Sequence, residues 1–318
     1  MTKGVDRRKR FFDKYTNQLK ILKENKLLPE SLNFKEGVYL CPICLNEFTE
    51  HDLDLSSTNM LTLEDAPPKS LGGHSRTLTC KACNSRCGHE IDFHLTERLI
   101  EIDVRAFLPK VIAKAKLTHK GVQVQGEVKI SEDGTISVIH REKYNHPEKL
   151  KKYVSSTGKD DLVEIEFNAS RVDKHRLEVA LLKTAYILAF EQYGYALILS
   201  SAFDIVRKQL ENPDSEIYPQ GFWTKQTSFK REHEGVHFVN DKEFEGFYAI
   251  FLLKTKSSET RFGVYLPLAK EKTQEVIENL KGMEGGFAVK MISYMANDYF
   301  EDIENMRLMF NHMKNKNE

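Results

Sequence analysis

The chain has 318 residues, which is enough for two domains, and 40% of them are hydrophobic, which is enough for a real core. Lysine plus arginine and aspartate plus glutamate number 47 each, so the formal net charge is zero. This balance argues against a global electrostatic attraction to nucleic acid, and any anionic partner must be bound by a local patch. The hydrophobic content also argues against wholesale disorder.

Membrane-spanning and secretory segments are not expected. Residues 1–12 lack the apolar core of a secretory signal. The most apolar stretch, 180–206, is interrupted by Lys183, Glu191 and Asp204, so it is too polar to span a bilayer. We therefore expect a soluble, cytoplasmic protein without a membrane partner.

Residues 2–28 are predicted to form a basic amphipathic helix. Apolar side chains recur at helical spacing, and basic residues outnumber acidic ones (apolar: Phe11, Tyr15, Leu19, Leu22, Leu27). Such a helix can contact the phosphates of a nucleic acid. Alternatively, it is a solvated helix that packs through its apolar stripe, which is the more common role of a charged helix.

The next segment, 36–103, is predicted to be a strand, a β-hairpin and a helix. The expected elements are strands over 37–40, 59–63 and 77–79 and a helix over 82–98. Pro67 and Pro68 end the first strand of the hairpin after Glu64 and Asp65, and a pair of glycines then turns the chain. Strand, turn, strand and helix together make a ββα unit.

The remainder, 104–318, is predicted to be an α+β domain with mostly antiparallel strands. Its expected strands are 122–139 (a hairpin), 162–167, 236–239, 247–253, 261–268 and 287–293, and its expected helices are 172–191, 196–210, 270–281 and 299–313. The predicted domains are therefore 1–35, 36–103 and 104–318. The two apolar helices of the last domain are core elements or a homodimer interface.

All five cysteines lie in the second segment, and four of them form two CxxC pairs, Cys41/Cys44 and Cys80/Cys83. In a chain without a secretion signal, this clustering favours metal ligation over disulfides. Each CxxC turn directs two sulfurs to one side, so two turns supply the four corners of a tetrahedral zinc site. Four thiolates leave no open coordination position, so this zinc is predicted to be structural. Cys87 is interpreted as a buried thiol.

Oxygen and nitrogen ligands lie between and just after the two CxxC pairs. Glu64 and Asp65 end one predicted strand, and Asn84 lies in the first turn of the predicted helix. If the hairpin folds onto that helix, carboxylate and amide oxygens converge, and such hard ligands suit Mg²⁺ or Mn²⁺. The sequence thus predicts a second, divalent cation site between the hairpin and the helix.

These motifs resemble the HNH endonuclease family. The resemblance runs from Cys41 to Leu95 and is carried by CPIC, by LEDAPPKSLGG and by LTCKACNSRCG. It implies a ββα-metal unit fastened by zinc, and a divalent-metal-dependent endonuclease that hydrolyses phosphodiester bonds in DNA. Glu64 falls on the family's metal-binding acid, Asp65 on its general-base histidine and Asn84 on its last metal ligand.

The chain departs from the family at two of its three signature positions. Asp65 replaces the histidine, and Ser75 stands near the position of the middle asparagine. An aspartate can accept a proton but, with an ordinary pKa of about 3.9, it is a weaker base than imidazole. It could also serve as a second metal ligand beside Glu64. His74 and His89 are candidate replacements for the base.

Two further residues are accessory candidates. Asp92 could be an extra metal ligand or a capping residue, and Lys69 could hold a phosphate or be a solvated loop lysine. The alternative to an HNH-type nuclease is a catalytically inactive module, fastened by zinc, that binds nucleic acid or another protein. The two hypotheses differ in whether the chain still hydrolyses DNA without the general-base histidine of the family.

Overall fold

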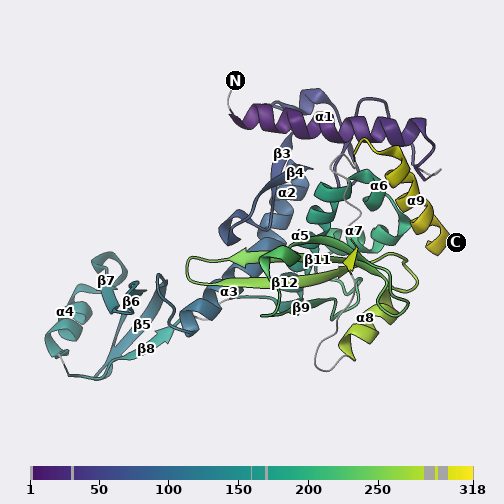
Figure 1. Cartoon of the computed structure of the whole chain (residues 1–318). Coiled ribbons are helices and arrows are strands. Elements are labelled where there is room, and N and C mark those ends of the chain that lie inside the picture. The colour runs from purple at the N-terminus through teal and green to yellow at the C-terminus, as the bar shows by residue number, and fades with distance from the viewer. Residues whose placement is uncertain are drawn as a thin grey trace. The chain divides into compact units, whose positions relative to one another are not determined.

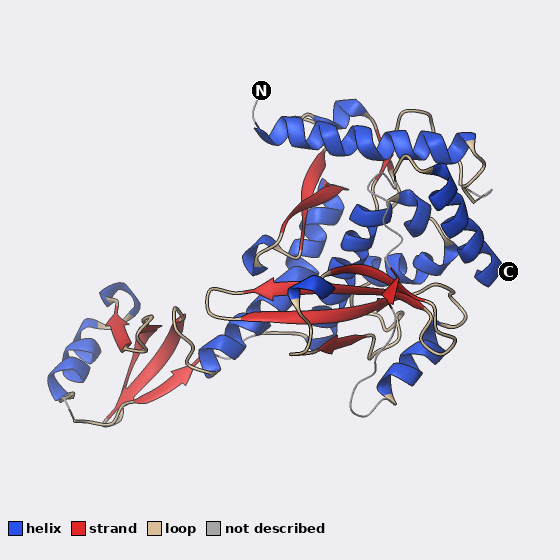
Figure 2. Cartoon of the chain, in the orientation of Figure 1, coloured by secondary structure: helices blue, strands red, loops and turns tan. Residues whose placement is uncertain are grey.

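The computed structural model describes residues 3–29, 32–158, 160–168, 171–282, 291–292 and 300–317. Helices and antiparallel sheets are mixed along the chain, which confirms the α+β class (Figure 2). Among the residues described, no helix combines the length and the apolarity needed to cross a bilayer.

The chain divides into two compact units. The first joins Met1–Leu95, Asp173–Leu253 and Thr260–Glu318, and the second joins Thr96–Val172 with Lys254–Glu259. The predicted boundaries at 35/36 and 103/104 were placed from sequence composition, whereas these units group residues that are in contact. The amino-terminal helix, the cysteine segment and the apolar helix of the second half belong to one unit.

The first unit begins with α1 (Lys3–Glu24), which contacts the cysteine segment (Figure 1). Three members of the predicted apolar stripe, Tyr15, Leu19 and Leu22, are each at most 1% exposed, as the helix alternative predicted. Phe11 is only partly buried, and Phe12, at 3% exposed, takes its place in the core. The segment that follows contains β1 (Tyr39–Leu40), β2 (Glu47–Phe48), η1 (Glu50–Leu53), β3 (Leu61–Ala66), η2 (Lys69–Leu71), β4 (His74–Cys80), α2 (Lys81–Cys87) and the π-helical turn η3 (Gly88–Asp92). The next helix, α3 (Phe93–Arg105), begins in this unit and continues from Thr96 in the second unit.

The helix α5 (Lys174–Tyr193) forms the core of this unit. Most of its side chains are buried on all sides, as expected for a helix that is apolar around its whole circumference. It ends at Gly194, whose φ of 63° is easy only for glycine, and a Cβ there would lie 2.0 Å from Gln18 Oε1. Gln18 accepts a hydrogen bond from the backbone N–H of Tyr195 at 2.8 Å and donates one to the carbonyl of Tyr193 at 2.9 Å.

The same unit contains a five-stranded sheet in the order β13-β10-β11-β12-β9. Its elements and their neighbours are α6 (Tyr195–Ile198), η5 (Ser201–Phe203), α7 (Asp204–Glu211), β9 (Trp223–Lys225), η6 (Arg231–His233), β10 (Gly235–Val239), β11 (Gly246–Lys254), β12 (Glu259–Leu266), α8 (Thr273–Lys281), β13 (Met291–Ile292) and α9 (Ile303–Asn317). The sequence did not predict β9. Of the strand predicted over 287–293, only 291–292 lie within the described residues, and residue 299 of the predicted last helix lies outside them.

The second unit is a four-stranded antiparallel sheet in the order β7-β6-β5-β8 with a helix packed on it. Its elements are β5 (Ile112–His119), β6 (Val122–Ile130), β7 (Ile136–His140), η4 (Glu142–Tyr144), α4 (Pro147–Ser156) and β8 (Glu164–Phe167). Alternate residues of β5 and β6 point inward, and Ala115, Leu117, Val124 and Val128 pack with Tyr153 of α4.

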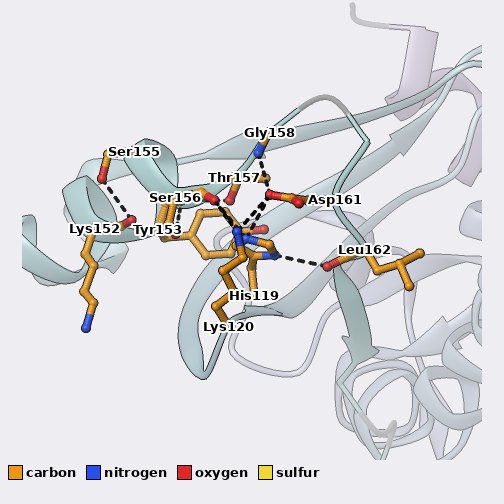
Figure 3. Close-up of polar contacts among 10 residues, drawn as sticks. All are labelled: His119, Lys120, Lys152, Tyr153, Ser155, Ser156, Thr157, Gly158, Asp161 and Leu162. Carbon is orange, nitrogen blue, oxygen red and sulfur yellow. Dashed lines mark hydrogen bonds and ion pairs between the residues drawn. The ribbon is translucent and has the colours of Figure 1, made fainter.

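Hydrogen bonds of His119 and Asp161 fasten the loop between α4 and β8 (Figure 3). We call these two residues and their partners the polar clamp. His119, at the end of β5, is only 4% exposed, and both of its ring nitrogens face oxygen acceptors. Nδ1 lies 3.1 Å from the carbonyl of Leu162, and Nε2 lies 2.9 Å from the carbonyl of Ser156 and 3.2 Å from the carboxylate of Asp161. Asp161 also accepts a hydrogen bond from the N–H of Gly158 at 2.8 Å.

Acidification is expected to open this clamp. The Gly158 N–H, together with Lys120, holds the pKa of Asp161 below its ordinary value. A lowered folded-state pKa stabilises the fold above the unfolded-state value, and this contribution is lost as the pH falls through the folded-state pKa, that is, below about 4. Chemical denaturation of the second unit, followed by NMR at pH 7 and at pH 3, should show this acid loss in the wild type and in the Asp160→Ala control. Asp161→Ala should be less sensitive to acid, and an unchanged loss in that variant would contradict the expectation.

Candidate metal centre

The first cysteine pair lies in the turn between β1 and β2, which are antiparallel partners. Leu45, with φ of 56°, donates its N–H to the carbonyl of Cys41 at 2.8 Å and so closes the turn. Two buried tyrosines hold this turn from the core: Tyr195 bonds to both backbone groups of Leu40, and Tyr186 of α5 donates to the carbonyl of Pro42.

The second pair joins the end of β4 to the start of α2. Cys80 is the N-cap of α2, and its sulfur accepts a hydrogen bond from the backbone N–H of Cys83 at 3.4 Å. The N–H of Cys80 in turn donates to the sulfur of Cys41 at 3.4 Å. The end of a strand and the first turn of a helix therefore present two sulfurs toward the first pair.

The four sulfurs of Cys41, Cys44, Cys80 and Cys83 all lie within 4.8 Å of one another. The sulfurs of Cys44 and Cys80 are 3.9 Å apart, close to the separation of about 3.8 Å that tetrahedral Zn–S bonds of about 2.3 Å produce. Burial raises the pKa of Cys41, while hydrogen bonds from the neighbouring thiols lower that of Cys80. The predicted cysteine ligands are thus brought together, and they can hold a metal ion such as zinc.

Beyond the cysteines, the β3–β4 hairpin is followed directly by α2, with which both strands are in contact. This element order agrees with the predicted one, but the strands are longer than expected. Glu64 and Asp65 lie near the end of β3, as predicted, and the strand continues for one more residue, to Ala66. That the arrangement is an HNH unit stays a prediction.

Glu64 lies in the protein interior, with 2% of its surface exposed. One carboxylate oxygen accepts a hydrogen bond from the Thr79 hydroxyl at 2.8 Å, and the other is 2.6 Å from the ammonium of Lys183 on α5. Both oxygens of the predicted metal-binding acid are therefore already occupied by protein groups.

Lys183 joins Glu64 to a second carboxylate, that of Asp92, at 2.6 Å. Burial alone would lower the pKa of Lys183, but Asp92 and Glu64 outweigh burial and hold it above its ordinary value. Burial raises the pKa of Asp92, and among the described residues its buried Oδ1 atom has no hydrogen-bond partner. The accessory candidate Asp92 is thus part of an internal ion cluster.

Asp65 has other contacts than its neighbour Glu64. The pairing of β3 with β4 shifts register between these two residues, and the Asp65 side chain lies beside Ser75 instead of Thr79 and Lys183. It is half-buried and accepts a hydrogen bond from the Ser75 hydroxyl at 2.8 Å. The two predicted catalytic acids therefore share no hydrogen-bond partner, and only Asp65 is partly exposed.

Asn84 connects α2 to β3. Its amide nitrogen donates to the hydroxyl of Thr62 at 3.0 Å and to the carbonyl of Leu63 at 2.9 Å. The same side-chain amide has only its oxygen left for a cation. These two hydrogen bonds hold α2 against β3, and this structural role does not depend on a bound cation.

The remaining candidates lie apart from this interior cluster. His89 and Lys69 are exposed, whereas Cys87 is buried, and burial raises its pKa to about 12. The π-helical turn between α2 and α3 contains Asp92, so the spacing of an ideal α-helix does not apply from Asn84 to Asp92. Apart from the four cysteines, no group of three or more His, Cys, Asp or Glu residues suited to a metal ion occurs in the described part of the chain.

Sequence reasoning missed Lys183 as a partner of the hairpin. The signal was present, because Lys183 is an isolated charge in a highly apolar helix, and such a residue needs a counter-charge when it is buried. The partner could not be inferred, because it is more than ninety residues away along the chain.

Comparison with known proteins identifies no relative. No protein-family model, no curated protein sequence and no solved structure matches this chain.

Proposed function

We propose that this chain acts on nucleic acid as an endonuclease of the HNH type, with the metal-bound hairpin and helix as its scaffold. The observation that carries the proposal is Asp65. Its carboxylate lies partly exposed on a hairpin fixed by two cysteine pairs, and the Ser75 hydroxyl orients it. A carboxylate held in this way can accept a proton from a water molecule as its oxygen attacks the phosphorus of a phosphodiester. The bond from phosphorus to the leaving oxygen then breaks.

The two metal sites fit the residues unequally. The four cysteines suit a structural zinc, in number and in spacing. A Mg²⁺ or Mn²⁺ ion at Glu64 and Asn84 does not fit the structure as it stands, because Lys183 and Thr79 occupy both oxygens of Glu64. We therefore derive no catalytic step through a divalent ion.

The same ion pair favours a second candidate function, a binding module without catalysis. An acid neutralised by an internal lysine binds no catalytic cation, and Asp65 is a weaker base than the histidine of the family. Such a module would bind DNA with the same scaffold. The predicted homodimer through 104–318 belongs to neither candidate and stays a prediction.

Plasmid nicking separates the two candidates. We expect the wild type to nick supercoiled DNA in Mg²⁺ or Mn²⁺, and Asp65→Ala to lose about a hundredfold or more of the rate, the usual effect of removing a general base. Glu36→Ala is the matched control, since that side chain is 90% exposed. Elemental analysis should show the same zinc content in all three proteins.

Two outcomes would count against the nuclease. One is DNA retention without nicking in either metal or in EDTA, which would leave the binding module. The other is an equal rate for Asp65→Ala and the wild type, which would place any cleavage elsewhere.

A further inference from the structure

The exposed edge of the β3–β4 hairpin is bordered by α1. At this edge Asp65 is the register partner of Ser75. Arg7 of α1 donates through Nη2 to the backbone carbonyl of Ser75 at 3.1 Å. The carbonyl and the hydroxyl of a single residue thus link the Arg7 guanidinium to the Asp65 carboxylate.

A second arginine and a histidine lie one register position away. His74 is the register partner of Ala66, and Arg76 donates through Nε to the carbonyl of Ala66 at 3.1 Å. Nη1 of Arg76 also bonds to both carboxylate oxygens of Glu191, at 3.1 and 3.0 Å. The Glu191 contact fixes the orientation of Arg76.

Both guanidinium groups keep donors for a ligand. A guanidinium carries five N–H donors, and within the described ranges no acceptor is bonded to Nη1 of Arg7 or to Nη2 of Arg76. His74 is exposed, and partial burial together with the charges of Arg76 and Arg7 lowers its pKa. Whatever its charge, an imidazole ring donates at least one hydrogen bond.

The basic side chains of α1 extend this surface. Arg7, Arg10 and Lys14 follow the spacing i, i+3, i+7 and so lie along one side of the helix. Lys14 contacts the carbonyl of Glu191 at 3.4 Å, so this side of α1 faces the same edge from Arg7 to Lys14. Around His74 the charges of Arg7 and Arg76 are balanced by those of Asp65 and Glu191. Arg10 and Lys14 add two further cations along the helix.

We propose that Arg7, His74 and Arg76 form a binding site for a backbone phosphate of nucleic acid, next to Asp65. This inference rests on the proposed function and names the residues through which the substrate is held. A guanidinium matches the geometry of phosphate oxygens, and a stripe of cations one helical turn apart suits a polyanion better than a single phosphate ion. The amino-terminal helix is then part of the substrate site.

Binding of a short fluorescent DNA duplex, measured by anisotropy in EDTA, tests this site without requiring cleavage. We expect Arg7→Ala to weaken binding by about tenfold, the effect of one charge-assisted hydrogen bond, and to reduce the slope of log affinity against log salt by about one. Lys20→Ala removes the same charge from an exposed position of the same helix, and it should change the affinity by less than about twofold. His74→Ala should weaken binding as well.

Several results would overturn the inference. They are equal losses for Arg7→Ala and Lys20→Ala, no measurable duplex binding by the wild type, or displacement of the duplex by inorganic phosphate at constant ionic strength. If Arg7→Ala nicks DNA as fast as the wild type does, the phosphate site is wrong and the proposed nuclease stands. If DNA binding depends on Arg7 but the wild type does not nick DNA, the phosphate site stands and the proposed nuclease is wrong. Circular dichroism and zinc content should match the wild type in every variant compared.

Discussion

Replacing Cys80 by serine is expected to abolish metal binding and to unfold the hairpin segment. The sulfur of Cys80 is one of four within 4.8 Å of one another, and it also caps α2. Structural zinc contributes about 10–16 kcal/mol in small zinc domains, whereas a whole domain is stable by only about 5–15 kcal/mol. Loss of the site therefore exceeds what the rest of the segment can supply.

The control is Cys87→Ser, which changes a buried thiol outside the cluster. It should keep the wild-type zinc content, with only a local cost in stability. Zinc is measured by elemental analysis, and folding by the NMR signals of Tyr39 and Thr77, which meet beneath the hairpin at 3.1 Å. Wild-type protein purified without zinc or another metal would contradict the assignment.

Replacing Lys183 by methionine is expected to cost about 3–5 kcal/mol of unfolding free energy. The change leaves the buried carboxylate of Glu64 and the carboxylate of Asp92, which is 16% exposed, without their shared cation. The cost is a large fraction of the stability of a domain, so the variant should be partly unfolded or strongly sensitive to denaturant. Urea denaturation followed by circular dichroism measures the difference.

Two comparisons make this expectation specific. Lys174→Met changes a lysine of the same helix whose side chain is 86% exposed, and it should cost less than about 1 kcal/mol. The triple variant Glu64→Gln, Asp92→Asn, Lys183→Met removes all three charges, and it should recover much of the loss because no buried charge remains unpaired. A cost below about 1 kcal/mol for Lys183→Met alone would show that the cluster does not stabilise the fold.

The cysteine cluster could be predicted from the sequence because its geometry is mostly local. A CxxC turn brings two sulfurs together within four residues, and the structure places both pairs as that spacing predicts. The α+β class and the approximate positions of most helices and strands could be predicted for the same reason, since hydrophobic periodicity acts within each element. The buried stripe of α1, with Tyr15 at its centre, is of this kind.

The surroundings of the predicted catalytic residues depended on contacts between distant segments. Glu64 is occupied because Lys183 of α5 reaches it from the core, and Asp65 borders a basic surface because Arg7 of α1 reaches Ser75. The π-helical turn that contains Asp92 is also invisible to a periodicity of 3.6 residues. Local patterns constrain which side chains share a face of one element, but only the packing of elements decides which charges meet. The sequence alone therefore determined the cysteine cluster that can hold a metal ion, whereas the tertiary structure decided which acid is buried and which is partly exposed.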